Sequence, residues 1–292
     1  MNFWASFVVA LTVLAAFRPL ASQATDRCER IVSTAPSVTE LLFDLGLGSR
    51  LVGATEFCRY PSDALKVPRV GGYLDLNLER VVALKPSVVF GLKESEAALK
   101  PLERFNVETQ LLDHTSLGGI RASYSKVAQI CGISERAQMK LAAFAARERL
   151  LAESCRASRG SGALKRVMVV VGRTREGSAD SGVYVSGSDG FYSDIVSLLG
   201  AANVHAGRTV AVPSLSAEGI RALAPDVVID IVNVDDPADE RGFDAFWRQF
   251  PELPAVQQGR VVVLSDDYAS IPGPRYITLA ERLSKVICAA GH

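Results

Sequence analysis

Two stretches of the chain decide how the fold is organised: "NLERVVALKPSVVF" at 77–90 and "SAEGIRALAPDVVI" at 216–229. Aligned without a gap, they share Glu, Ala, Leu, Pro and two Val at the same positions. Each reads as a short helix that ends at proline, followed by an apolar run typical of a buried strand. The same helix–strand unit therefore occurs once in each half, which predicts two lobes of related architecture rather than a solenoid of many copies.

Apolar runs alternate with helical patterns around both repeats. In the first half, "RIVSTA" at 30–35 and "RLVGAT" at 50–55 read as strands on either side of the helical "SVTELLFDLGLG" at 37–48. In the second half, "KRVMVVVG" at 165–172 and "GRVVVLSD" at 259–266 read as further strands. Strands and helices that take turns favour parallel pairing with crossover helices. The expected fold class is α/β, in two lobes.

A long helical segment, "SERAQMKLAAFAARERLLAESCRA" at 134–157, lies between the matching halves. It holds no Gly or Pro and many strong helix formers. At 1.5 Å per residue it would reach roughly 36 Å, about the width of a small domain. It is either a strut that connects the lobes or a surface helix within one of them, and its central position favours the strut. The expected lobes are then residues 25–133 and 158–292.

The first residues differ in composition from the rest. Residues 5–17, "ASFVVALTVLAAF", form an uncharged apolar run of signal-peptide length, and small residues at 22–24 offer a cleavage point after Ala24. A retained membrane anchor is the alternative, but the run is short for a span. No cysteine directly follows the cut. We expect residues 1–24 to be a signal peptide of an exported protein without a lipid anchor.

Composition and motifs argue against several functions. Lys+Arg and Asp+Glu both total 32 in 292 residues, so no strong field attracts nucleic acid. The sequence has no G-x-S-x-G, no Walker P-loop and no H-E-x-x-H, so an enzyme would need an unrecognised site. The three histidines are far apart and no C-x-x-C occurs, which argues against a zinc site. The expectation is a binding protein with no catalytic residue and no resident metal or cofactor.

Cysteines fit an exported protein but do not reveal their partners. The five are Cys28, Cys58, Cys131, Cys155 and Cys288, all beyond the expected cut. Export permits disulfides, and an odd number leaves at least one thiol outside an intramolecular bond. A structural role is expected, with the pairing left open.

The order of these segments resembles a known family. From 30 to 86 the chain resembles the N-terminal lobe of ABC-transporter substrate-binding proteins for cobalamin, haem and iron chelates, most of all the cobalamin-binding members. The resemblance continues through the long helix and "SLSAEGIRALAPDVVI" at 214–229 to "DDYASIPGPR" at 266–275. It implies two Rossmann-like lobes bridged by one rigid helix, with a ligand held in the cleft between them. It also implies a periplasmic monomer that delivers its ligand to the permease of an ABC importer.

In open α/β sheets, ligands bind outside the carboxyl ends of the strands. The loops at these ends carry aromatic and polar side chains, which suit a large, flat, partly apolar ligand. By the resemblance, three of the rings, Phe57, Tyr73 and Tyr268, occupy positions that face the ligand in cobalamin-binding members. For any single ring, ordinary packing is the alternative. The full set of expected ligand contacts is Phe57, Tyr73, Lys93, Arg173, Tyr184, Asp267 and Tyr268.

The ligand itself is less well specified. Leu92 and Val212 stand where the cobalamin-binding members have indoles. Tyr73 could serve as an axial haem ligand, although Asp75 stands where haem binders commonly have arginine. A corrinoid ranks first, a ferric chelate second and haem third. In each case the bound species is itself a metal complex.

By the resemblance, the two repeats, at 77–90 and 216–229, also predict a docking site for the permease. In the resembling transport proteins, one glutamate on each lobe docks against arginines of the permease. The matching residues are Glu79 and Glu218, each the third residue of its repeat. The alternative is that a glutamate in the first turn of a helix only complements the helix dipole.

Overall fold

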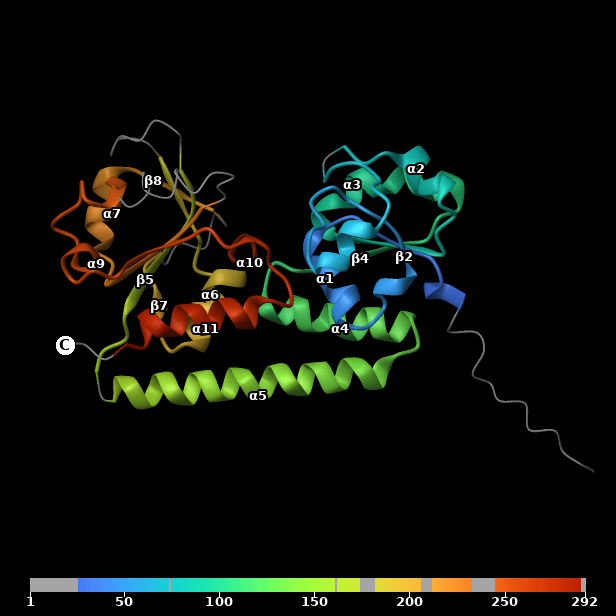
Figure 1. Ribbon diagram of the computed structural model, residues 1–292. Coiled ribbons are helices and arrows are strands. Elements are labelled where there is room, and N and C mark those ends of the chain that lie inside the picture. Colours follow the sequence, from blue (N-terminus) through green and yellow to red (C-terminus); the bar gives the residue numbers. More distant parts are fainter. Residues whose placement is uncertain are drawn as a thin grey trace, which may run out of the picture.

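A computed structural model shows two lobes side by side, with one long helix running beneath both (Figure 1). The structure describes residues 26–73, 75–160, 162–173, 182–205, 212–232 and 245–289. The predicted signal peptide, residues 1–24, lies outside these ranges. Within them, no helix is both long and apolar enough to cross a membrane.

The N-terminal lobe is built on a four-stranded parallel sheet in the order β2-β1-β3-β4. Strands β1, β2 and β3 are mostly buried, as expected inside a parallel sheet with both faces covered, whereas the edge strand β4 is buried only at Leu112. The strands are β1 (Ile31–Ser33), β2 (Leu51–Ala54), β3 (Val88–Leu92) and β4 (Thr109–Leu112). The α-helices are α1 (Pro36–Asp44), α2 (Leu78–Ala83), α3 (Glu96–Leu99) and α4 (Leu117–Ile130). Short 3₁₀ turns are η1 (Asp26–Cys28), η2 (Gly48–Arg50), η3 (Ser62–Lys66), η4 (Lys93–Ser95) and η5 (Lys100–Phe105).

The C-terminal lobe has a mixed sheet in the order β10-β9-β5-β6-β8, with β7 paired to the start of β5. Strands β10, β9 and β5 are parallel, whereas β6 is antiparallel to both β5 and β8. The strands are β5 (Arg166–Arg173), β6 (Val183–Val185), β7 (Ala202–Asn203), β8 (Ser214–Leu215), β9 (Val227–Ile231) and β10 (Val261–Leu264). The helices are α6 (Phe191–Leu198), α7 (Ala217–Leu223), α9 (Pro254–Gln257), α10 (Asp267–Ser270) and α11 (Tyr276–Ile287).

The two sequence repeats form the same structural unit. Helix α2 is capped by Asn77, whose side chain accepts the Arg80 N–H, and α7 is capped by Ser216, which accepts the Gly219 N–H. Each helix leads into a central strand, β3 or β9. The residue before the proline has a positive φ in both copies: 47° at Lys85 and 41° at Ala224. The repeats therefore share their caps and the sharp helix-to-strand turn as well as their sequence.

Helix α5 (Ser134–Arg159) connects the lobes and extends two residues beyond the predicted 134–157 segment. Its 26 residues span roughly 39 Å, enough to underlie both lobes. Along its length it packs against α4 and α11 (Figure 1). Rings from these three helices, Tyr124, Phe144 and Tyr276, stack in a row with centroids 5.4 Å apart at each step. One apolar core thus continues from lobe to lobe.

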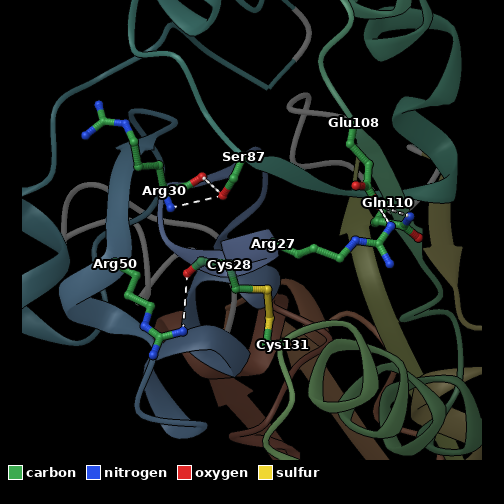
Figure 2. The surroundings of a disulfide bond; sticks show 8 residues. All are labelled: Arg27, Cys28, Arg30, Arg50, Ser87, Glu108, Gln110 and Cys131. Atoms are coloured by element: carbon green, nitrogen blue, oxygen red, sulfur yellow. Dashed lines mark hydrogen bonds and ion pairs between the residues drawn. A yellow bond between two sulfur atoms is a disulfide. The ribbon is translucent and has the colours of Figure 1, made fainter. Parts of the chain in front are cut away.

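Two disulfides lie close to the ends of α5. Cys28 bonds to Cys131, just before the helix begins, and Cys155 near its end bonds to Cys288 after α11. Figure 2 shows the first bond, beside which Arg50 donates to the Cys28 carbonyl. Cys58 is a buried free thiol. Each lobe is therefore enclosed in its own covalent loop and tied to one end of the bridge.

Candidate functional site

A cavity of about 580 Å³ opens between the lobes at the carboxyl ends of their strands. The loop after β4 supplies one wall, and the ends of β5 and β6 with the start of α6 supply the other. Its lining residues are His114, Thr115, Ser116, Val171, Ser186, Asp189, Gly190, Phe191, Tyr192, Val212 and Pro272. The arrangement matches the rule that open α/β sheets bind ligands at this edge.

The polar groups of the N-terminal wall are fixed by neighbours. His114 is 3% exposed, and its Nδ1 lies 2.8 Å from the Ser37 hydroxyl. Burial lowers the pKa of His114 to about 4, although the Pro272 backbone and Asp113 oppose the shift, so the ring is neutral at neutral pH. The Thr115 hydroxyl and N–H and the Lys93 ammonium lower the pKa of the Asp113 carboxyl to about 2. This wall therefore presents hydroxyls and a neutral imidazole.

The lobes approach each other closely on both sides of this cavity. Gly190 adopts φ 92°, and a Cβ there would lie 3.1 Å from the Thr115 carbonyl oxygen. A Cβ on Gly273 would lie 3.0 Å from the Ser37 Cβ. The Asp194 carboxylate also accepts the Leu117 N–H across the interface, at 2.9 Å. These contacts close the floor of the cleft.

A second contact between the lobes is a cluster of charged residues around Arg275. The guanidinium binds Glu40 of α1 through Nε and Nη2, at 2.9 and 2.5 Å, and Asp267 of α10 through Nη1 and Nη2, at 2.6 and 3.1 Å. Burial raises the pKa of Glu40 against the opposing effect of Arg275. Pro272 lines the large cavity, whereas Arg275 lines a second cavity of about 350 Å³. The 272–275 segment therefore passes between two hollows in the interface.

The sequence matches the periplasmic binding protein family over residues 31–268. The chain belongs to that family. A vitamin B12-binding protein of Pectobacterium atrosepticum is 28% identical over 261 residues, 87% of each chain. A vitamin B12-binding protein of Yersinia pseudotuberculosis is 26% identical over 276 residues, 94% of this chain and 90% of the relative.

Solved structures of similar proteins confirm the two-lobed fold. The periplasmic haem-binding protein of Vibrio cholerae superposes with a TM-score of 0.73 at 26% identity, over 88% of this chain and 98% of that chain. The periplasmic vitamin B12-binding protein of the same organism gives a TM-score of 0.72 at 24% identity, over 89% and 96%. The α/β class predicted from the alternating pattern is thus confirmed for this binding protein.

The predicted ligand contacts of the N-terminal lobe lie at several depths. Phe57, in the loop after β2, is 53% exposed. Tyr73 is partly buried and packs against the shared core. Lys93 lies at the end of β3, where its ammonium is 2.9 Å from Asp113. None of the three lines the 580 Å³ cavity. Their contact with a ligand stays a prediction.

Three of the four predicted contacts of the C-terminal lobe are not buried. Tyr184 is 39% exposed on β6, on the opposite face of the sheet from Val183 and Val185. Asp267 is exposed and bonded to Arg275, and the Tyr268 hydroxyl donates to Asp266 at 3.0 Å. These residues remain candidate contacts at the edge of the cleft.

Arg173 is not on the cavity wall. Its side chain is 7% exposed, pairs with Asp230 and lies under the ring of Phe246, 4.4 Å from the centroid. A register shift between Val170 and Gly172 turns Arg173 toward the same face as Val183, into the lobe. Strict alternation along β5 would have placed it on the other face. A ligand contact by Arg173 would require this ion pair to break.

Both predicted docking glutamates are exposed in the first turn of their helices. Glu79 lies on α2 and Glu218 on α7, and each helix is on the side of its lobe away from α5 (Figure 1). Sequence reasoning missed the Glu40–Arg275 pair and His114 as elements of the site. The motif that contains Arg275 was visible, but nothing in the sequence links it to a residue so far away in the chain.

Proposed function

We propose that the protein captures a corrinoid and delivers it to an ABC importer. Membership of a solute-binding family supports the capture role, and relatives named vitamin B12-binding support the corrinoid. The choice of ligand class rests on the charge of the residues that line the cleft. Among the described residues that line the 580 Å³ cavity there is no Lys or Arg, and Asp189 contributes a carboxylate.

Large, flat metal complexes differ in the charge at their edges. Haem carries two carboxylates and many ferric chelates are anionic, whereas a corrinoid has mostly neutral amide arms and a single phosphodiester. Burying an anion without a cation is costly. Two cations beside the cleft, Lys93 and Arg275, already bind carboxylates. This arrangement favours a ligand whose edge offers amides to hydroxyls and to Asp189.

The second candidate is a haem or another ferric chelate. The haem-binding relative of the same fold favours it, as does the partly buried ring of Tyr73, which could ligate iron. For this ligand the iron complex is the cargo and not a resident cofactor. No reaction is proposed for either ligand, because the family binds solutes.

Visible spectroscopy distinguishes the candidates. The purified protein is incubated separately with cyanocobalamin, haemin and a ferric siderophore, and each sample is desalted before its spectrum is recorded. Retention of the corrinoid bands alone is the expected result. Retention of the haem Soret band alone would transfer the assignment to the second candidate. Calorimetry then gives the affinity of the retained ligand.

Export and docking complete the proposal. The apolar run at 5–17 acts as a signal peptide cut near Ala24, which releases a periplasmic monomer without a lipid anchor. Glu79 and Glu218 then dock on the permease, one from each lobe, so that two anchors fix orientation as well as affinity. Intact-mass analysis of the exported protein checks the cut: a mass that still includes Met1, in a membrane fraction, would contradict it.

A further inference from the structure

Arg275 belongs to the C-terminal lobe but has partners in both lobes. It directly precedes α11, and Asp267 on α10 is its partner within the lobe. Glu40, its other partner, is on α1 of the N-terminal lobe and 4% exposed. The Arg275 side chain is itself 13% exposed, so this cross-lobe ion pair is largely shielded from water. Shielded, bidentate arginine–carboxylate pairs have a fixed geometry.

The same guanidinium also contacts aromatic rings from both lobes. Its Cζ lies 4.1 Å from the ring centroid of Tyr60, in the loop after β2, and 5.9 Å from that of Tyr268 on α10. Arginine stacks on rings through its planar face while its edges hydrogen bond. One side chain thus sets the positions of two rings that come from opposite sides of the interface.

The backbone beside Arg275 leaves little freedom for the lobes to slide. A Cβ on Gly273 would lie 3.0 Å from the Cβ and 3.2 Å from the Cα of Ser37, so the two lobes are already in close backbone contact there. Ser37 and Glu40 both belong to α1. The 273–275 segment therefore contacts α1 of the N-terminal lobe at two residues, Ser37 and Glu40.

We propose that Arg275 is a positioning residue that fixes the separation of the two lobes and of the Tyr60 and Tyr268 rings, and thereby sets the width of the ligand cleft. The ligand part of this inference rests on the proposed function. The lobe-spacing part does not. Arg275 itself is not expected to contact the ligand, because Glu40, Asp267 and the rings occupy its edges and faces.

The chain contains a matched control for this role. Arg173 and Asp230 form another shielded arginine–carboxylate pair, and the aromatic contacts described for it, Phe246 and Trp247, lie with it in the C-terminal lobe. Loss of Asp230 should weaken that lobe without changing the distance between lobes. Loss of Glu40 should change the distance.

Spin labels at two exposed positions, Lys100→Cys and Gln258→Cys, report the distance between lobes by double electron–electron resonance. The wild-type background should give one narrow distribution. Glu40→Gln and Arg275→Lys should broaden or shift it, because a lysine keeps the charge but loses the bidentate and stacked geometry. Asp230→Asn should leave it unchanged. Circular dichroism and urea unfolding identify variants that are folded.

Ligand binding supplies a second measurement. Cyanocobalamin affinity of Glu40→Gln should fall about tenfold, or about 1.4 kcal/mol, as the separation of the lobes changes. An unchanged distance distribution in folded Glu40→Gln and Arg275→Lys would overturn the inference, as would an equal change in Asp230→Asn. If the wild-type protein retains no corrinoid, the proposed function fails, whereas the distance measurement still decides the role of Arg275.

Discussion

The two lobes share a three-strand plan and differ at the fourth strand. In the N-terminal lobe β1, β3 and β4 are neighbours, as are β5, β9 and β10 in the C-terminal lobe. Beside β1 lies the parallel β2, but beside β5 lies the antiparallel β6. The repeated helix–strand unit therefore specifies the centre of each sheet and leaves its edge open to change.

Chain length explains the difference. Helix α1 separates β1 from β2, so the chain can cross over and return in parallel. The connection from Arg173 to Val183 is shorter than the roughly dozen residues that a crossover needs, so β6 returns as the second strand of a hairpin. Helix α6 then leads into β7, which pairs in parallel with the start of β5 over two residues. Strand β7 is thus the short counterpart of β2, displaced by an inserted hairpin.

Removal of a disulfide should have the largest effect, and it tests whether the two disulfide-closed lobes unfold independently. Replacing Cys28 and Cys131 by Ser, or Cys155 and Cys288 by Ser, should each cost about 2–5 kcal/mol of unfolding free energy, because each bond closes a loop of more than 100 residues. In a protein expressed without residues 1–24, Trp247 is the single tryptophan and its fluorescence reports on the C-terminal lobe. We expect its urea transition to shift in both variants, since the core is continuous.

The control is the replacement of the unpaired Cys58 by Ser, which breaks no disulfide. A Trp247 transition that moves only when the Cys155–Cys288 bond is removed would contradict the continuous core and would divide the molecule into two independent folding units.

Asp230→Ala, in the lobe with the mixed sheet, should also have a large effect. It breaks the buried ion pair between Asp230 and Arg173, and breaking a buried pair by removing one partner typically costs about 3–5 kcal/mol. Asp63→Ala, which breaks the exposed pair with Lys66 in the other lobe, should cost less than about 1 kcal/mol. Urea unfolding followed by circular dichroism compares them; equal costs would show that burial of the Arg173 pair contributes little.

Acid should lower the unfolding free energy of the protein through protonation of His114. Its folded pKa of about 4 is below the ordinary 6.5, so its stabilising contribution is complete above pH 6.5 and is lost as pH falls toward 4. The loss is about 3 kcal/mol at most. Unfolding free energies measured from pH 7 to pH 4 should therefore fall less steeply in His114→Gln than in the wild type. Parallel pH profiles would remove His114 as the cause.

Ring truncation compares predicted ligand contacts from the two lobes. Phe57→Ala, Tyr73→Ala and Tyr184→Ala should each weaken corrinoid binding by about 1–2 kcal/mol if the ring stacks on the ligand. The matched control is Leu65→Ala, which truncates another exposed apolar side chain near Phe57 in the sequence and should have no effect. Calorimetry measures the change. Unaltered affinity in all three ring variants would mean that the ligand binds elsewhere.

The smallest single effects are expected at the docking surface. Glu79→Ala or Glu218→Ala should leave folding and ligand affinity unchanged and reduce transport modestly, since exposed ion pairs contribute about 1 kcal/mol or less. Changing both to Arg places like charges against the permease arginines and should abolish uptake in a reconstituted system. Normal uptake by this double variant, with normal ligand binding, would return both glutamates to a helix-dipole role.

The sequence predicted what depends on local pattern. Apolar runs and helix-stop residues located the central strands, the repeated units and α5, because strand burial and helix capping are properties of neighbouring residues. Strands β6 and β8 were missed, since they are only three and two residues long and carry little pattern. Arg173 was predicted as a ligand contact at the end of a strand, and its buried pairing with Asp230 was not expected, because a register shift cannot be read from the sequence.

The candidate site was less predictable than the fold. Rim residues such as Tyr268 could be named from the positions of strand ends and from family resemblance. The Glu40–Arg275 pair joins residues from the two ends of the chain, and no periodicity connects them. His114 was expected only as part of the loop 114–116 at a strand end, and its burial could not be predicted because it depends on how the lobes meet.

The position of Cys58 has a consequence for biosynthesis. The two native bonds follow each other along the chain without crossing, so each lobe can oxidise as a separate unit. Under the proposed export from the N-terminus, however, Cys58 would reach the oxidising compartment before Cys131, so Cys28 would meet this incorrect partner first. The native pairing skips one cysteine. Early folding that hides Cys58 beside Thr55, or a disulfide isomerase that corrects the first bond, is then a requirement for the yield of native protein.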